Sequence, residues 1–222
     1  MHQKQRQMSE TFRLGALLTV VGGFLDTYTY LSRGGVFANA QTGNIVLLGL
    51  SLAQGNYEML LHYLIPILAF AAGVMVTDMV RAHFRPRPAI HWRQLIVAAE
   101  FLILLMVAYV PPGRWDAAVN VAVSFVCAMQ VESFRKIRGN AVATTMCTGN
   151  LRQMGEHILA FVVDKRPGAL RGVFKYVAII VSFVMGAVIG TFFVAEMQEE
   201  AIWICCYTLF FVLSYLLVME DG

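Results

Sequence analysis

The tripeptide Thr42-Gly43-Asn44 recurs as Thr148-Gly149-Asn150, 106 residues later, in a chain of 222 residues. At the same offset Asp26 aligns with Glu132 without a gap. Ordered matches at one fixed spacing are typical of an internal duplication, which constrains the fold more than any single motif does. The sequence therefore predicts two related halves, each with an acidic residue ahead of its tripeptide.

The offset grows to 113 residues beyond the tripeptides, where Gly73 aligns with Gly186. A longer loop in the second half accounts for the difference. We expect one repeat at about 11–112 and the other at about 113–219, within a single membrane domain that covers residues 1–222.

Composition points to a membrane protein and away from several functional classes. Hydrophobic residues make up 58% of the chain and charged residues 14%, whereas a soluble domain is about one quarter charged. The four cysteines show neither a pairing pattern nor a metal-ligand spacing. The sequence also lacks a nucleophile–base pair, a phosphate-binding loop and a nucleic-acid-reading motif. We therefore expect a lipid bilayer as partner, with no enzyme activity, cofactor, metal or nucleic acid.

Six stretches are long and apolar enough to cross a bilayer, which takes about 20 residues. They are Leu14–Ser32, Met59–Val80, Leu95–Val110, Ala117–Phe134, Val173–Met197 and Ala201–Met219. Two shorter segments, Asn44–Gln54 and Asn150–Val163, begin at the tripeptides. As helices they would reach only about 18 and 22 Å, against about 30 Å of hydrocarbon.

The basic residues predict that the two short helices do not cross. If each enters and leaves on one side, only Arg33 and Arg114 of the 17 Lys and Arg residues lie opposite the amino terminus. Cytoplasmic loops are generally the basic ones. We therefore expect both termini in the cytoplasm and two re-entrant segments. The alternative is eight full spans in parallel repeats.

Three spans per half would invert the second half relative to the first. The predicted fold is an all-α polytopic membrane protein with six transmembrane helices and two re-entrant half-helices, arranged as an inverted 3+3 repeat. Transporters repeatedly use this architecture and bind their solute where interrupted helices meet.

The tripeptides have a physical role in such a fold. A helix that begins inside the membrane has four backbone N–H groups without partners and no water to bind them. Thr42 or Asn44 would cap the first half-helix, and Thr148 or Asn150 the second. The glycines would allow close approach of other chain segments. The positive helix ends would then face a solute, although a purely structural helix start is equally compatible.

Carboxylates within a membrane are costly and usually face the protein interior. Asp26 would bind solute or a coupling proton, or would clamp the free N–H groups of the nearby re-entrant loop. Glu132 would form a local ion pair with Arg135, Lys136 or Arg152.

Arg152 would select a polar or anionic solute at a constriction, or form an i,i+4 pair with Glu156. Asn39 precedes the first tripeptide and Thr144-Thr145 precedes the second. These small polar groups would line a narrow passage or pack helices together. The stretch Gly186–Gly190 would pack within the protomer or between the protomers of a homo-oligomer.

These motifs resemble the YoaK-like family of bacterial six-span membrane proteins, whose function is unassigned. In the first half the likeness rests on Gly22-Gly23-Phe24-Leu25-Asp26, Phe37-Ala38-Asn39, Thr42-Gly43-Asn44 and Val46-Leu47-Leu48-Gly49. In the second half it rests on Ala128-Met129-Gln130, Arg138, Thr144-Thr145 and Thr148-Gly149. The resemblance spans nearly the whole chain. It implies six spans in the bacterial inner membrane and implies no substrate.

We expect a small-solute transporter whose path runs between the two half-helices, with proton coupling through Asp26 as one variant. Asp26 and Asn44 would shape one half-site, and Asn150, Thr144 and Arg152 the other. The alternatives are a passive channel, whose capped half-helices would resemble those of aquaporins, and a membrane scaffold or sensor that transports nothing.

Overall fold

The computed structural model describes residues 12–85, 91–137, 140–141 and 147–220. These residues form the helices α1 (Phe12–Ser32), α2 (Gln41–Ala53), α3 (Tyr57–Phe84), α4 (Trp92–Val107), α5 (Asp116–Ser133), α6 (Cys147–Val162), α7 (Ala169–Met197) and α8 (Ile202–Glu220). A short 3-10 helix, η2 (Gln198–Ala201), joins α7 to α8. The strands β1 (Lys136–Ile137) and β2 (Asn140–Ala141) pair antiparallel. Apart from this short two-stranded ribbon, the described elements are helical, as the sequence predicts.

Every apolar stretch predicted from the sequence forms one helix. The two short helices begin slightly earlier than expected, α2 at Gln41 and α6 at Cys147. Within the described residues, three stretches are long and apolar enough to cross a membrane: α1, α3 and the nearly continuous run Ala169–Val218, which contains both α7 and α8. The helix α2 is apolar but shorter.

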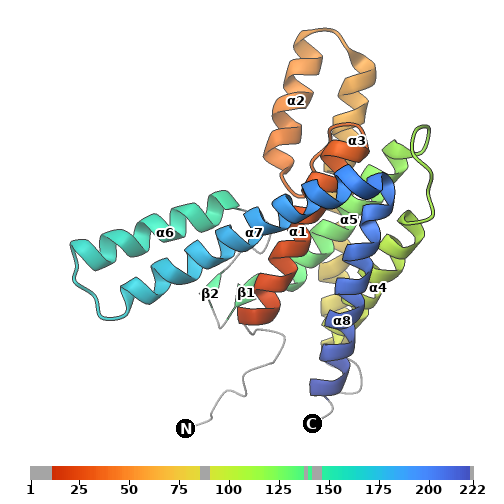
Figure 1. Ribbon diagram of the computed structural model, residues 1–222. Coiled ribbons are helices and arrows are strands. Elements are labelled where there is room, and N and C mark those ends of the chain that lie inside the picture. Colours follow the sequence, from red (N-terminus) through yellow and green to blue (C-terminus); the bar gives the residue numbers. More distant parts are fainter. Residues whose placement is uncertain (1–11, 86–90, 138–139, 142–146, 221–222) are drawn as a thin grey trace.

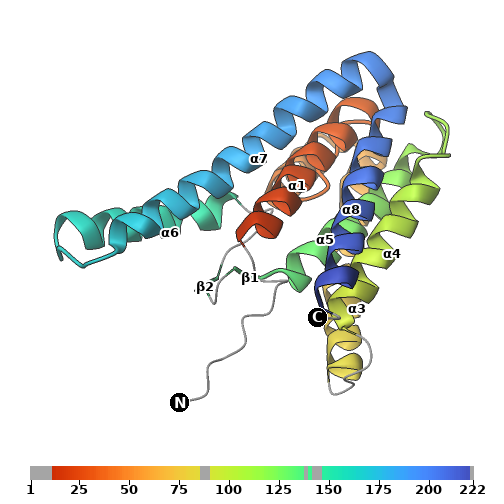
Figure 2. The same cartoon turned by 60° about the horizontal axis from the view of Figure 1, so that its bottom comes forward.

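Helices from the two halves of the chain pack against one another (Figures 1 and 2). α1 packs on α7, α3 packs on α5, and α4 contacts both α5 and α8. α2 lies along α3 and α6 lies along α7, and each pair projects from the bundle as a hairpin (Figure 1). The two hairpins point in different directions, α2–α3 upward and α6–α7 to the left in that view. The start of α1 and the end of α8 lie at the lower end of the bundle in Figure 1.

Glycines form the closest helix crossings. A Cβ added to Gly73 of α3 would lie 2.6 Å from the carbonyl oxygen of Phe125 in α5. A Cβ added to Gly186 of α7 would collide with the carbonyl oxygen of Val20 in α1. Gly186 and Gly190 both contact α1, so this glycine-rich stretch packs within the protomer. The structure thereby decides between the two alternatives that the sequence left open for it.

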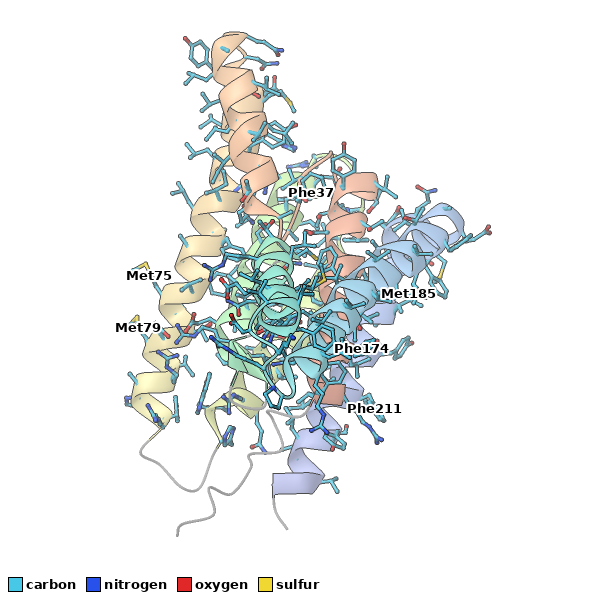
Figure 3. The ribbon with its side chains drawn as sticks, turned by 90° about the vertical axis from the view of Figure 1, so that its left-hand side faces the viewer. Phe37, Met75, Met79, Phe174, Met185 and Phe211 are labelled. Carbon is cyan, nitrogen blue, oxygen red and sulfur yellow. The ribbon has the colours of Figure 1, made fainter. Side chains whose placement is uncertain are left out.

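Large apolar side chains cover the outside of the bundle. Met75 and Met79 on α3, Phe174 and Met185 on α7, and Phe211 on α8 point outward (Figure 3) and are 48–68% exposed. Soluble monomers rarely expose apolar surface on this scale. Lipid covers such surface without penalty, so the surface is that of a membrane protein.

We predict opposite results for the same substitution at two glycines. Gly186→Ala places a methyl group against the backbone of α1 and lowers the free energy of unfolding by about 1–3 kcal/mol, as overpacking does. Gly49→Ala on α2 meets no described atom within 4 Å. It is neutral or stabilising, because alanine favours a helix. Thermal melting in detergent measures both, and an equal loss of stability in the two variants would contradict this packing.

Candidate functional site

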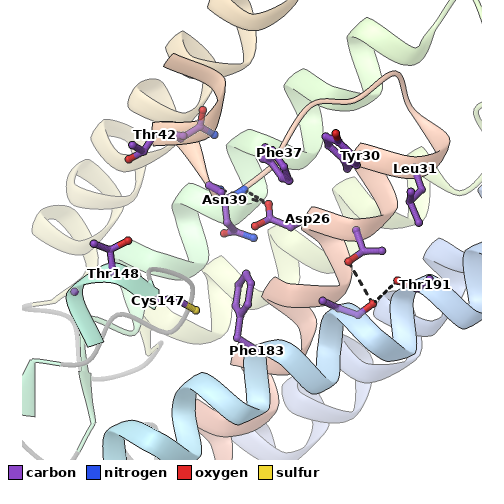
Figure 4. Close-up of a pocket in the computed structure, with 15 residues that line it drawn as sticks. Asp26, Tyr30, Leu31, Phe37, Asn39, Thr42, Cys147, Thr148, Phe183 and Thr191 are labelled. Carbon is purple, nitrogen blue, oxygen red and sulfur yellow. Dashed lines mark hydrogen bonds between the residues drawn. The ribbon is translucent and has the colours of Figure 1, made fainter. Parts of the chain in front are cut away.

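A cavity of about 630 Å³ lies where the starts of α2 and α6 approach α1 and α7 (Figure 4). Four elements and one loop line it. α1 and the loop after it provide Asp26, Thr27, Tyr30, Leu31, Phe37, Asn39 and Ala40; α2 provides Gln41 and Thr42; α6 provides Cys147, Thr148 and Gly149; and α7 provides Phe183, Ala187 and Thr191. The first residue of each tripeptide therefore lies at the same cavity.

The carboxylate of Asp26 binds the loop that leads into α2. Asp26 is 6% exposed, and its Oδ1 accepts hydrogen bonds from the backbone N–H groups of Asn39 at 2.6 Å and Ala40 at 3.4 Å (Figure 4). Hydrogen bonds to a charged group each contribute about 1.5–3 kcal/mol. Of the roles considered for Asp26, these contacts correspond to the clamp on the loop.

Two buried asparagines complete the fold of this loop. Asn39 donates from Nδ2 to the carbonyl oxygen of Gly22 at 3.0 Å. Asn44 accepts from the N–H of Phe37 at 3.0 Å and donates to the carbonyl oxygen of Phe37 at 2.7 Å. Asn44 thus replaces a backbone partner for Phe37 and holds the loop against the first turn of α2.

The expected caps of the first half-helix are wrong. The N-cap residue of α2 is Ala40, and no side chain caps it locally. Thr42 and Asn44 lie inside the helix. The carboxylate of Asp26, on a neighbouring helix, instead accepts from the N–H groups of Asn39 and Ala40 just before α2, a partner that rules based on nearby sequence do not detect.

The predicted cap of the second half-helix is not tested, because the residues just before α6 lie outside the described residues. α6 begins at Cys147, so Thr148 and Asn150 lie within its first turn rather than before it. Asn150 is 2% exposed. None of the described residues lies within 4 Å of a Cβ built on Gly149, whereas a Cβ on Gly43 would lie 3.0 Å from the ring of Phe37. The predicted close approach is therefore confirmed for the first glycine, and for the second it stays a prediction, because residues 142–146, which lead into α6, lie outside the described residues.

The predicted site residue Gln130 lies away from the cavity lining. Gln130 donates to the carbonyl oxygen of Leu18 at 2.8 Å, which ties α5 to α1. Thr144 and Thr145 lie outside the described residues.

Both local ion pairs predicted from the sequence are confirmed. Glu132 pairs with Arg135 at 2.7 Å and also with Arg81 at 3.1 Å. Arg152 pairs with Glu156 at 3.6 Å, with side chains 73% and 55% exposed.

Sequence reasoning missed the α7 wall of the cavity. Phe183, Ala187 and Thr191 recur every four residues and therefore share one helix face. Thr191 is a hydroxyl within a long apolar helix, and this was the available signal. The hydroxyl of Thr27 on α1 donates to the carbonyl oxygen of Ala187 at 3.3 Å, so the wall is tied to the helix that carries Asp26.

Arg33 was also missed, because the sequence places it in a loop. It is 0% exposed. Its guanidinium donates to Asp116 at 2.9 Å, to the carbonyl oxygen of Val110 at 2.9 Å and to the hydroxyl of Tyr28 at 2.9 Å. These bonds join the end of α1 to the α4–α5 connection and fix the entry into the loop that Asp26 holds.

Comparisons with known proteins agree with a membrane protein and give no activity. The profile of a family described as "Protein of unknown function (DUF1275)" matches residues 14–215. The chain is also similar to "UPF0700 transmembrane protein YoaK" of Bacillus subtilis (strain 168), with 27% identity over 197 residues, covering 85% of this chain and 86% of that protein. No solved structure matches.

We predict that Asp26 is required for stability as well as for any activity. Asp26→Leu removes the acceptor for the N–H groups of Asn39 and Ala40 and lowers the free energy of unfolding by about 1.5–3 kcal/mol. Asp26→Asn keeps an acceptor oxygen and loses less. Glu200→Gln, at an exposed position, is the control and melts as the wild type does. If Asp26→Leu melts as the wild type does, the clamp is not a stabilising contact.

Proposed function

Because the chain belongs to the family described as "Protein of unknown function (DUF1275)", we propose its function from the geometry of the site: it transports a small solute along a path between the half-helices α2 and α6. One observation carries the proposal. Thr42 and Thr148, equivalent positions of the two repeats, line one cavity of about 630 Å³ together with Asp26. A cavity of this size takes a small molecule.

The inverted repeat is part of the proposal, and the packing of the helices supports it. α1 against α7 corresponds to α5 against α3, and α6 along α7 corresponds to α2 along α3. The tight glycines of these crossings, Gly73 and Gly186, are the pair that the 113-residue offset aligns. A duplication related by a two-fold axis produces such matched contacts.

We further propose six spans and two re-entrant helices. α3 and α7 have 28 and 29 residues, or about 42 Å of helix, enough to cross a bilayer with some tilt. α2 and α6 have 13 and 16 residues, or about 20 and 24 Å, and lie beside those long helices. The distribution of basic residues then favours both termini in the cytoplasm of a bacterium, in its inner membrane.

The roles of individual groups follow from their positions. The first turns of α2 and α6 lie at the cavity, and the positive ends of their helix dipoles favour an anionic or carbonyl group of a solute. Asp26 holds the loop and is the group through which protons would couple to transport. We propose no catalytic residue and no cofactor.

Transport is tested by uptake into proteoliposomes across a solute panel, with and without a pH gradient. We predict that Thr42→Trp and Thr148→Trp each reduce uptake to the level of empty vesicles, because an indole fills the cavity. Leu50→Trp, on the exposed face of α2, keeps wild-type uptake. Saturable uptake indicates a carrier, whereas rapid unsaturable flux indicates a channel. Absence of flux for every solute, together with copurification of a stoichiometric partner, would favour the scaffold instead.

A further inference from the structure

The helix α6 has a charged stripe that its counterpart α2 lacks. Thr148, Arg152 and Glu156 follow one another at four-residue spacing, so they lie along one side of α6. The positions that the 106-residue offset assigns to Arg152 and Glu156 on α2 are Val46 and Leu50. All four of these residues are more than half exposed: Arg152 and Glu156 have 73% and 55% of their side chains exposed, and Val46 and Leu50 are 58% and 52% exposed.

Contact of these exposed side chains with lipid would cost little free energy on α2 and much more on α6. Val46 and Leu50 are compatible with contact to lipid. An arginine and a glutamate are not, because charges in hydrocarbon are expensive. The Arg152–Glu156 pair, at 3.6 Å, leaves 73% and 55% of the two side chains exposed, so it does not replace the solvation that both charges would lose in hydrocarbon. The stripe therefore needs water on its surface.

The stripe starts at the cavity. Thr148 lines it, and Arg152 and Glu156 continue from Thr148 toward the loop between α6 and α7. A second sector of α6 is apolar: Leu151, Ile158 and Val162 are 50%, 42% and 63% exposed. Leu159, seven residues after Arg152, lies on the charged side and is apolar and 60% exposed. The side that suits water therefore runs from Thr148 to Glu156, and Glu156 lies at a surface hollow that Arg166 and Gly168 of the α6–α7 loop also line.

We propose that the charged stripe of α6 forms one wall of a water-filled vestibule, which connects the cavity with the α6–α7 loop side and has no counterpart along α2. This inference deepens the proposed function, on which its transport role rests. In this arrangement a hydrated, polar solute enters through the vestibule. The part of the path along α6 is then lined by water, and the part along α2 is apolar.

Cysteine labelling tests the vestibule without a known solute. In a Cys147→Ser background the three remaining native cysteines are buried. Arg152→Cys and Glu156→Cys should react with a membrane-impermeant maleimide about tenfold faster than Val46→Cys and Leu50→Cys, because a thiol in hydrocarbon does not ionise. The α2 variants are matched controls at the repeat-equivalent positions. Slow labelling at both α6 positions overturns the proposal.

An amphipathic helix that lies flat on the membrane surface would also label quickly. Spin labels on the apolar sector of α6 separate the two arrangements. A helix that descends from the loop to the cavity places a label at Leu151 deeper than one at Val162, by up to about 16 Å at 1.5 Å per residue. Equal depths at Leu151, Ile158 and Val162 overturn the vestibule.

Failure of the vestibule and failure of transport give different results. Thr148→Trp blocks the cavity and should leave the labelling rate of Glu156→Cys unchanged, because water still enters from the loop side. Fast labelling with no flux for any solute would reject the transporter and keep the vestibule. Flux without fast labelling would reject the vestibule and keep the transporter.

Discussion

A loop that enters an apolar bundle needs acceptors for its backbone N–H groups, because it has no helical hydrogen bonds and little water to supply them. In this protein the acceptor for the approach to α2 is the carboxylate of Asp26, which binds the N–H groups of Asn39 and Ala40. Asn44 then satisfies both backbone groups of Phe37. The position of the loop, the start of α2 and one wall of the cavity all depend on these bonds.

The cavity also depends on how closely the long helices cross. Glycine lets α7 reach the backbone of α1, and lets α3 reach that of α5. Since α2 and α6 accompany α3 and α7, these crossings bring the starts of the short helices together. The strong ion pairs lie elsewhere: Arg33 binds Asp116, and Glu132 binds Arg81 and Arg135. Among the described residues that line the cavity, Asp26 is the acidic one.

In the proposed inverted repeat, the two halves share one backbone arrangement and differ in the residues on their surfaces. Val46 and Leu50 of α2 are replaced at equivalent positions of α6 by Arg152 and Glu156. A duplicated fold needs only its packing residues in common, so under the proposed duplication the outward faces of the two short helices are free to differ. This difference is why we propose that the path is hydrated along α6 and apolar along α2.

The sequence by itself determined where the helices lie, that the chain belongs in a membrane, and which close neighbours pair. Helix positions follow from the length of apolar runs, and the Glu132–Arg135 and Arg152–Glu156 pairs follow from helical spacing. Only the tertiary structure showed that the contacts of Asp26 are those of a clamp on the loop. It also showed that Thr42 and Thr148 line one cavity together with Phe183 and Thr191, and that Arg33 is buried against Asp116. Those contacts join residues far apart in the chain. They are set by the helix crossings, which no local pattern of residues encodes.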